Sequence, residues 1–332
     1  MDLVETPAEE ERNGSALAWA ALALYDVGYC TITPIHAMKN ATFQVHADSG
    51  DRYCLRVQSP QGGEPAELRS ELLWLAALRT EAGLVVAAPV PTRAGDLLGT
   101  VRQEGDLAAR SCVLFRAVEG RPLGDADLTT ATFKRMGAAT GNLHAYAEWW
   151  RPPSRFQRER LDVGVMGSPR FVGGGLAGGF FLIDSGDDEV LWSAVRQVLA
   201  AMRELGEGRE VFGIVHGDPA ASNWLLYEDE VRLTGFDQCA WSYYLYDLTL
   251  TLRSKEDSPE YPDLRAALLE GYRSVRRLSS QHEAYLETFL IMADLVRVVS
   301  VLRNANHPTF RDWAPEFVRR SLTTLRIRTA SV

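Results

Sequence analysis

The sequence predicts an α+β fold in which a strand-rich N-terminal lobe precedes a mainly helical C-terminal lobe. Two segments of alternating polarity, residues 42–47 and 52–57, flank a polar turn and predict a β-hairpin near the N-terminus. Towards the C-terminus, apolar residues recur at helical spacing, most clearly over residues 282–303. The 332 residues are enough for two such lobes with a sizeable core.

The N-terminal lobe is predicted to comprise residues 1–115. We expect a first helix over residues 15–28, which begins with a serine N-cap. After the hairpin, Pro65 opens a second helix in which leucines recur every three or four residues. Two more strands are expected near residues 97–102 and 112–115, so this lobe would be a sheet with one long helix.

Residues 116–124 are predicted to connect the two lobes, and residues 125–332 to form the C-terminal lobe. Helices are expected over residues 128–150 and 188–206, where apolar residues share one face. The stretch between these helices contains five glycines within seven residues, which predicts an irregular segment with a flexible loop.

Three large side chains of the helix over 128–150 are expected to be mainly structural. His144 lies on an apolar face and is predicted to be a hydrogen-bonded core residue, not a ligand. Trp149 and Trp150 are expected to pack, and the alternative is an aromatic wall for a cationic substrate.

Composition and charge disfavour several classes of protein. The net charge of −9 is spread along the chain, which disfavours a nucleic-acid partner. This charge serves solubility or, alternatively, favours a cationic small substrate. Four widely spaced cysteines predict neither disulfides nor a zinc site and fit a reducing cytoplasm. The acidic N-terminus and the short apolar runs predict no signal peptide and no membrane segment.

The segment that begins at His216 predicts phosphoryl-transfer chemistry. Such chemistry needs an acidic group at the nucleophile and oxygen ligands for magnesium. Asp218, two residues after His216, is the candidate base that accepts a hydroxyl proton. Asn223 is a candidate metal ligand. The alternative is an ordinary Gly-Asp-Pro turn that Asn223 caps.

A short hairpin follows this motif. The expected strands flank an acidic turn at residues 228–230. If the turn has three residues, Asn223 lies opposite Gly235, with Cβ positions about 5 Å apart. Two side chains at these positions could hold one magnesium ion, which explains why the motif needs this spacing.

Several segments match one family in order and spacing. They are Val27 to Ile35, Asn40 to Phe43, Tyr53 to Val57, Ser70 to Leu75, Leu84 to Pro91, Leu143 with His144, His216 to Asn223, and Tyr243 to Leu248. In these segments the chain resembles the aminoglycoside phosphotransferase and choline kinase-like superfamily. The likeness is greatest to its homoserine kinase type II and stress-response Ser/Thr kinase branch, and it extends over about residues 15–320. The resemblance implies the two-lobe fold of protein kinases.

The resemblance assigns nucleotide binding to the N-terminal lobe. Residues Met38 to Thr42, with Asn40 among them, would form the turn above the phosphates. Arg56 would bind a phosphate, because arginine is always charged and can grip two oxygens. Glu71 would pair with Arg56 and hold it. Without the resemblance, Arg56 is more simply a solvated arginine and Glu71 a surface charge.

The resemblance also assigns roles beyond the phosphates. Residues Leu114 to Val118, which include Phe115, would line the adenine pocket. Asp218 would be the catalytic base, and Asn223 a magnesium ligand. Asp247 would brace the catalytic loop. These roles imply an enzyme, an ATP-dependent phosphotransferase with ATP and Mg2+ as cofactors. Its acceptor would be a hydroxyl of a small molecule, such as an amino alcohol, an aminoglycoside or a homoserine-like compound, or of a protein Ser/Thr.

One position departs from the family pattern. The strand after the hairpin usually ends with an aspartate that binds magnesium, and Gly235 occupies that place. Asp237 is the candidate replacement, although two residues of a strand span about 6.6 Å. Gly235 would permit the backbone shift that this replacement requires. The alternative is a catalytically impaired, kinase-like protein that binds a nucleotide or another ligand.

Overall fold

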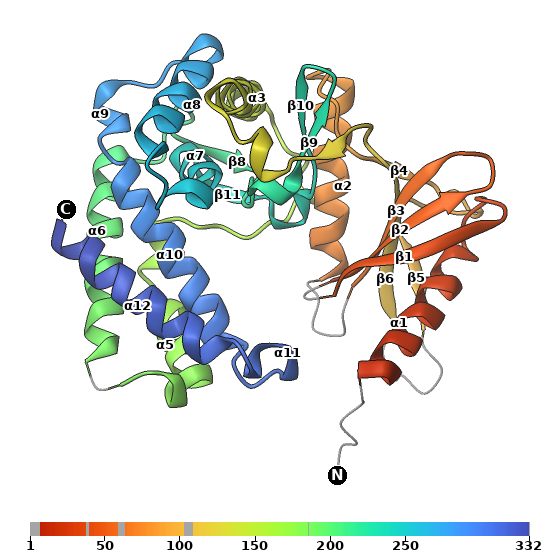
Figure 1. The fold of residues 1–332 in the computed structure, drawn as a ribbon, viewed down its shortest axis with the longest axis horizontal. Helices are drawn as coiled ribbons and strands as arrows, with labels where there is room; N and C mark the ends of the chain where they lie inside the picture. The colour runs from red at the N-terminus through yellow and green to blue at the C-terminus, as the bar shows by residue number, and fades with distance from the viewer. Residues whose placement is uncertain (1–6, 38–39, 59–63, 103–108, 185, 332) are drawn as a thin grey trace. The chain divides into compact units, whose positions relative to one another are not determined.

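The computed structural model describes residues 7–37, 40–58, 64–102, 109–184 and 186–331. The chain divides into two compact units, which Figure 1 draws as ribbons. The first consists of Met1–Glu119 and Pro152–Gln157, and the second of Gly120–Arg151 and Arg158–Val332. The short segment at 152–157 groups with the first unit, where the Gln157 N–H donates to Ser70 Oγ at 2.8 Å. The roles predicted for the two lobes, nucleotide binding and catalysis, stay predictions.

The first unit is built around a six-stranded antiparallel sheet. Its strand order is β1-β2-β3-β6-β4, and β5 also pairs with β6. The predicted hairpin is confirmed as β2 and β3, whose register sets Thr42 opposite Arg56. The strands are β1 (Cys30–Ala37), β2 (Asn40–Ala47), β3 (Arg52–Gln58), β4 (Ala88–Val90), β5 (Gly99–Val101) and β6 (Arg110–Arg116).

Two helices accompany this sheet. α1 (Pro7–Leu22) buries Leu17 against the sheet residues Val45 and Leu55, which form one apolar core. The first helix predicted from the sequence was wrong at both ends. It begins before its expected serine N-cap, and after Leu22 the chain continues in tight turns with bonds to carbonyls three residues back. α2 (Pro65–Thr80) begins with its proline in the first turn, as predicted.

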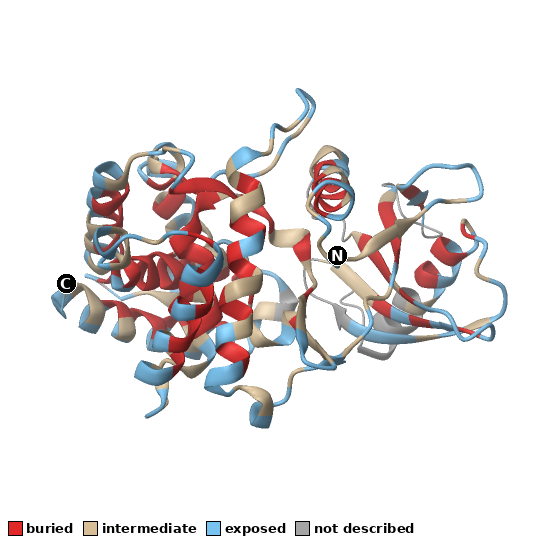
Figure 2. Cartoon of the chain, turned by 90° about the horizontal axis from the view of Figure 1, so that it is seen from above, coloured by how far each residue is buried: buried red, intermediate tan, exposed pale blue. Residues whose placement is uncertain are grey.

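The second unit is mainly helical. Its small strands are β7 (Arg121–Pro122), β8 (Phe212–Val215), β9 (Trp224–Tyr227), β10 (Glu230–Leu233) and β11 (Ala240–Tyr243). Its helices are α3 (Thr130–Trp149), α4 (Val163–Met166), α5 (Pro169–Gly179), α6 (Asp187–Leu205), α7 (Tyr244–Leu252), α8 (Tyr261–Val275), α9 (Ser280–Glu283), α10 (Leu286–Arg303), α11 (Pro308–Arg311) and α12 (Ala314–Ser331). α10 is buried along most of its length and packs against α5, α6, α7 and α12. Figure 2 shows that buried residues gather inside each unit.

The glycine-rich stretch forms helix α5, so its prediction as a loop was wrong. The reason is the close approach of α10. A Cβ added at Gly178 or Gly179 would lie 2.9 Å from the carbonyl oxygen of Leu302. Glycines therefore let the two helices meet backbone to backbone, and the packing outweighs the weak helix propensity of glycine.

A membrane-spanning helix is recognised by its length and apolar character. Within the part of the chain that the structure describes, no helix combines the length and the apolar character needed to cross a membrane.

Candidate active site

The loop that carries the predicted base is anchored to helix α7. Asp247 on α7 is fully buried and accepts hydrogen bonds from two backbone N–H groups of the loop. The His216 N–H donates to Oδ2 at 2.7 Å, and the Gly217 N–H donates to Oδ1 at 2.9 Å. Burial disfavours the charged carboxylate, but the hydrogen bonds from His144 and Gly217 hold the pKa of Asp247 below its usual range. The predicted brace is therefore present.

His216 ties the loop to the end of the hairpin. Its Nε2–H donates to the carbonyl oxygen of Thr234 at 2.9 Å, and its Nδ1 accepts the Asp218 N–H at 3.2 Å. Burial lowers the pKa of His216, so the ring is neutral near pH 7. With one nitrogen donating and the other accepting, this side chain fixes the backbone on both sides of the site.

Asp218 and Asn223 meet, as the motif predicts. The Asn223 Nδ2 group donates to the Asp218 carbonyl oxygen at 2.8 Å and to its Oδ2 at 3.1 Å. Burial and the charge of Asp237 raise the pKa of Asp218 to about 6, against the opposing hydrogen bond from Asn223 and the charge of Arg297. A carboxylate with this pKa is mostly ionised at pH 7 yet accepts a proton more readily than an ordinary aspartate.

The hairpin register differs by one residue from the prediction. The pairing of β9 with β10 leaves a turn of two residues, not three. Thr234, not Gly235, lies opposite Asn223, and its N–H donates to the Asn223 carbonyl oxygen at 2.8 Å. The reason is Glu228, whose φ of +52° closes the shorter turn.

Gly235 nevertheless lies beside the Asn223 side chain. It adopts left-handed dihedrals, φ 78° and ψ 48°. A Cβ built on it would lie 2.7 Å from Asn223 Oδ1 and 3.0 Å from Cγ. The amide oxygen of Asn223 thus faces the position where the family usually has an aspartate. In this conformation a side chain at residue 235 would displace the amide oxygen of Asn223.

The residues around Asp218 include the kinds of oxygen donor that Mg2+ binds. Asn223 uses Nδ2 to bind Asp218, which directs Oδ1, the atom that a cation needs, to the other side. Asp237 lies near enough for its charge to act on Asp218, and its Oδ2 accepts from Gln238 Nε2 at 3.1 Å. No group of three His, Cys, Asp or Glu side chains among the described residues could hold a metal. One amide oxygen and one or two carboxylates suit Mg2+, which completes its shell with phosphates and water.

The first unit contains the predicted ion pair. Arg56 Nη2 donates to Glu71 Oε2 at 2.6 Å, and the two residues are only 8% and 2% exposed. The solvated arginine and the surface glutamate are therefore excluded. The Arg56 guanidinium also lies over the Phe115 ring, 5.2 Å from its centroid. The planar guanidinium of an arginine has five N–H donors, so one such side chain can bind more than one anion.

The other predicted nucleotide residues lie on or beside the same sheet. Asn40 and Thr42 belong to strand β2, not to a turn, and Met38 lies outside the described residues. Phe115 is buried in β6, and Val118 is half-buried just after it. Their contacts with a nucleotide stay predictions.

Two arginines near Asp218 and Asp237 were missed by the sequence analysis. Arg297 on α10 lies over the Phe317 ring at 4.7 Å, and its charge acts on Asp218. Arg158 Nη2 donates to the Asp237 carbonyl oxygen at 2.6 Å. No sequence signal marks Arg297, because its relation to the motif comes only from the packing of α10 on α7.

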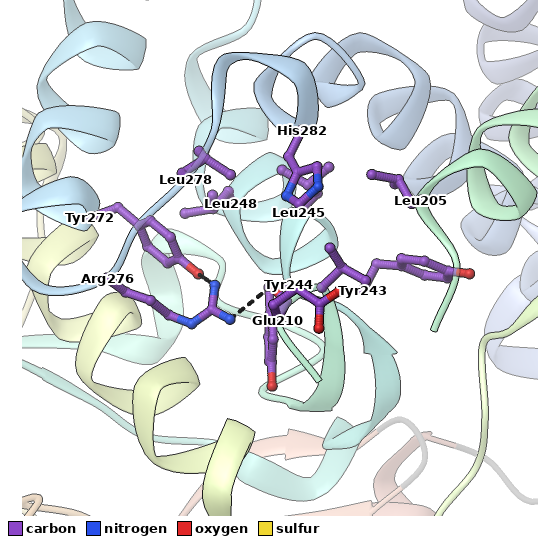
Figure 3. Close-up of a pocket in the computed structure, with 11 residues that line it drawn as sticks. Leu205, Glu210, Tyr243, Tyr244, Leu245, Leu248, Tyr272, Arg276, Leu278 and His282 are labelled. Atoms are coloured by element: carbon purple, nitrogen blue, oxygen red, sulfur yellow. Dashed lines mark hydrogen bonds between the residues drawn. The ribbon is translucent and has the colours of Figure 1, made fainter. Parts of the chain in front are cut away.

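The tryptophans at the end of α3 do not form a packed pair. Trp149 is 73% exposed, whereas Trp150 is half-buried, so the prediction that Trp149 packs was wrong. A pocket elsewhere in the second unit, drawn in Figure 3, has a volume of about 10 Å3. That volume suits roughly one water molecule, so the pocket is too small for a nucleotide or an acceptor.

Comparison with known proteins gives one family and a consistent set of folds. The family described as "Phosphotransferase enzyme family" matches residues 31–283. No curated protein matches the sequence.

Solved structures of kinases match nearly the whole chain. A microcompartment-associated aminopropanol kinase is 26% identical with a TM-score of 0.80, and the match covers 96% of this chain and 98% of that chain. An amicoumacin kinase, solved with AMP-PNP, Ca2+ and Ami, is 17% identical with a TM-score of 0.77, and 96% of each chain is covered. A choline kinase from Cryptosporidium parvum is 14% identical with a TM-score of 0.64, over 91% of this chain and 90% of that chain.

Proposed function

Because the chain belongs to the phosphotransferase enzyme family, we propose that it transfers the γ-phosphoryl group of ATP to a hydroxyl group of a small molecule, with Asp218 as the base. One observation carries this proposal. Asp218 has a pKa of about 6 and a carboxylate oriented by Asn223 on a loop that buried hydrogen bonds hold in place. Such a group is suited to accept a proton from an attacking hydroxyl near neutral pH.

In the proposed reaction Asp218 accepts the proton of the acceptor hydroxyl. The acceptor hydroxyl donates a hydrogen bond to the Asp218 carboxylate, and its oxygen attacks the γ-phosphorus. The new P–O bond forms as the bond between the γ-phosphorus and the β,γ-bridging oxygen breaks, and the proton passes to Asp218. ADP leaves with the electron pair of the broken bond. Most of the rate enhancement in such transfers comes from positioning and charge neutralisation.

We propose that Asn223 and Asp237 hold magnesium. When bound, the ion would neutralise negative charge on the phosphates. Replacing Asp237 by Asn should raise the Mg2+ concentration needed for half-maximal activity. Asp229→Asn is a matched control, because Asp229 lies exposed in the β9–β10 turn and pairs with Arg135. An unchanged magnesium titration for Asp237→Asn would remove Asp237 from the site.

Arg56 is the proposed phosphate contact in the first unit. The ion pair with Glu71 orients the guanidinium, and the planar N–H donors of an arginine suit phosphate oxygens. ATP as donor agrees with similar structures, of which one contains AMP-PNP and another ADP.

An amino alcohol is the acceptor class to test first. The neighbour at 26% identity is described as an aminopropanol kinase, and a more distant one as a choline kinase. The purified protein should be incubated with Mg2+, ATP and separate acceptors, namely aminopropanols, choline, homoserine, aminoglycosides and Ser/Thr peptides, and ADP release measured. Acceptor-dependent ADP release that Asp218→Asn abolishes would support the proposal. Full activity of Asp218→Asn would refute the role of Asp218.

Gly235 favours a second candidate, a catalytically impaired kinase-like protein that binds a nucleotide or another ligand. The position usually occupied by a metal-binding carboxylate has no side chain here. A specific ligand raises the melting temperature by mass action. A clear thermal shift with Mg2+-ATP, without ADP release for any acceptor, would favour this candidate over the enzyme.

A further inference from the structure

Asp247 is linked to a line of polar side chains that the reaction does not touch. His144 Nε2–H donates to Asp247 Oδ2 at 3.0 Å. The His144 Nδ1 atom lies 3.1 Å from the Tyr272 hydroxyl, and Arg276 Nη1 donates to that hydroxyl oxygen at 3.1 Å. The outer end is Arg276 Nη2, which donates to Glu148 Oε2 and to the Glu210 carbonyl oxygen, each at 2.8 Å. Figure 3 shows Arg276 between Tyr272 and Glu210.

We propose that Tyr272 and Arg276 are positioning residues, which act through His144 and Asp247 to fix the loop that carries Asp218. This inference rests on the proposed function, because it treats that loop as catalytic. Neither residue touches the reacting atoms.

The donor and acceptor roles along this line have one consistent direction. Arginine can only donate, so the Tyr272 oxygen accepts from Arg276 and its own O–H is directed to His144 Nδ1. His144 must then carry its proton on Nε2, which faces the Asp247 carboxylate. The opposite tautomer would set an Nε2 lone pair against that carboxylate. The hydroxyl of Tyr272 therefore donates to the one tautomer of His144 that the Asp247 carboxylate requires, and holds the ring in place from its other side.

Burial strengthens the hydrogen bonds of this line of side chains. Asp247, His144 and Tyr272 are fully buried, and Arg276 is 8% exposed. Burial also lowers the pKa of His144, so its ring is neutral and has one N–H to place. In such surroundings hydrogen bonds are electrostatically strong, and an unpaired polar group is costly.

The spacing of the participating helices is fixed by glycines. Tyr272 is on α8 and His144 on α3. A Cβ at Gly271 would lie 1.8 Å from the Lys134 carbonyl oxygen, and one at Gly137 would lie 2.0 Å from the Leu268 carbonyl oxygen. The two helices therefore meet too closely to admit side chains at these positions, which sets the distance between the hydroxyl and the imidazole.

The chain offers a matched pair of variants. Tyr272→Phe removes the hydroxyl between Arg276 and His144 and keeps the ring. Tyr244→Phe is the control, because its ring lies 4.6 Å from the His144 ring, but its buried hydroxyl has no partner among the described residues. We expect Tyr272→Phe to lower kcat roughly 10–100-fold with little change in KM for ATP, as for other residues that orient a site through a histidine. Tyr244→Phe should remain within about twofold of wild type.

A spectroscopic measurement separates positioning from general loss of structure. The 15N shifts of His144 report its tautomer, and hydrogen exchange of the Gly217 amide reports the loop. In Tyr272→Phe we expect the His144 Nδ1 shift to move, because this atom loses its hydrogen-bond donor, and the Gly217 amide to exchange faster, with both unchanged in Tyr244→Phe. If Tyr272→Phe does not fold, Arg276→Lys serves instead and should give a smaller change in the same direction.

These readouts do not depend on an identified acceptor. If no phosphoryl transfer is found, the Nδ1 shift and the amide exchange still decide whether Tyr272 orders the loop. Wild-type kcat, His144 shifts and Gly217 exchange in Tyr272→Phe would overturn the inference. A change of equal size in Tyr244→Phe would also overturn it, because general packing would then explain the effect.

Discussion

Gly235→Ala separates two roles of Gly235, its backbone conformation and the space that it leaves beside Asn223. A residue with a Cβ in the left-handed region is disfavoured by about 1–2 kcal/mol, and Gly235 has a φ of 78°. In addition, the new Cβ would meet Asn223 Oδ1 at 2.7 Å, so the amide must move. Gly186→Ala is the control, because Gly186 is also left-handed, with φ 98° and ψ −8°, lies in the same unit and has no heavy atom within 4 Å of an added Cβ.

Urea denaturation and steady-state kinetics distinguish the two effects. Both variants should lose about 1–2 kcal/mol of unfolding free energy. Only Gly235→Ala should lose activity, on the order of 100-fold if Asn223 is displaced by about 1 Å. Wild-type activity and stability of Gly235→Ala would refute the reasoning, and so would an equal loss of activity in Gly186→Ala.

Three further predictions concern charged side chains. Asp218→Asn should abolish activity yet raise the unfolding free energy at pH 7 by up to about 3 kcal/mol, because a raised carboxyl pKa destabilises the folded protein above that pKa. This gain should vanish below about pH 4, where the wild-type carboxyl is protonated in both states, and denaturation at the two pH values checks the difference. Glu71→Gln removes the carboxylate that pairs with the buried Arg56 charge, so it should cost about 3–5 kcal/mol of unfolding free energy in urea denaturation and raise KM for ATP. An unchanged KM would remove the pair from the nucleotide site. Arg297→Ala removes a cation that lowers the pKa of Asp218, so the acid limb of the pH–rate profile should move above about pH 6, and an unmoved limb would show that Arg297 does not act on the base.

The α+β class, the superfamily and the assignment to ATP-dependent phosphotransferases were predictable from the sequence and are confirmed. The resemblance to the superfamily supplied the family and the enzyme class, and local residue patterns predicted individual elements. Alternating residues gave the β2–β3 hairpin, and Pro65 with its spaced leucines gave α2. The pair of Asp218 and Asn223 was predictable because four intervening residues bring their side chains together in one loop.

The features that escaped prediction depend on contacts distant in sequence or on unusual dihedrals. The glycines of α5 are helical because α10 approaches them closely, and no local pattern reveals that contact. The hairpin register depends on a left-handed Glu228, a residue type that does not favour such a turn. The charge of Arg297 acts on Asp218 because helices pack together. The hydrogen bond between Tyr272 and His144 joins residues that are 128 positions apart in the sequence.

The pH dependence of kcat/KM tests the central claim most directly, because it measures the protonation of the proposed base in the free enzyme. The assay follows ADP release with saturating Mg2+ and an active acceptor between pH 4.5 and 8. With Asp218 as base, the rate should fall about tenfold per pH unit below the apparent pKa of Asp218, which Mg2+ bound at Asp237 lowers from its metal-free value of about 6, and Asp218→Asn should be inactive throughout. A wild-type profile without an acid limb even when Mg2+ is lowered below saturation, or activity in Asp218→Asn that matches wild type, would contradict the account.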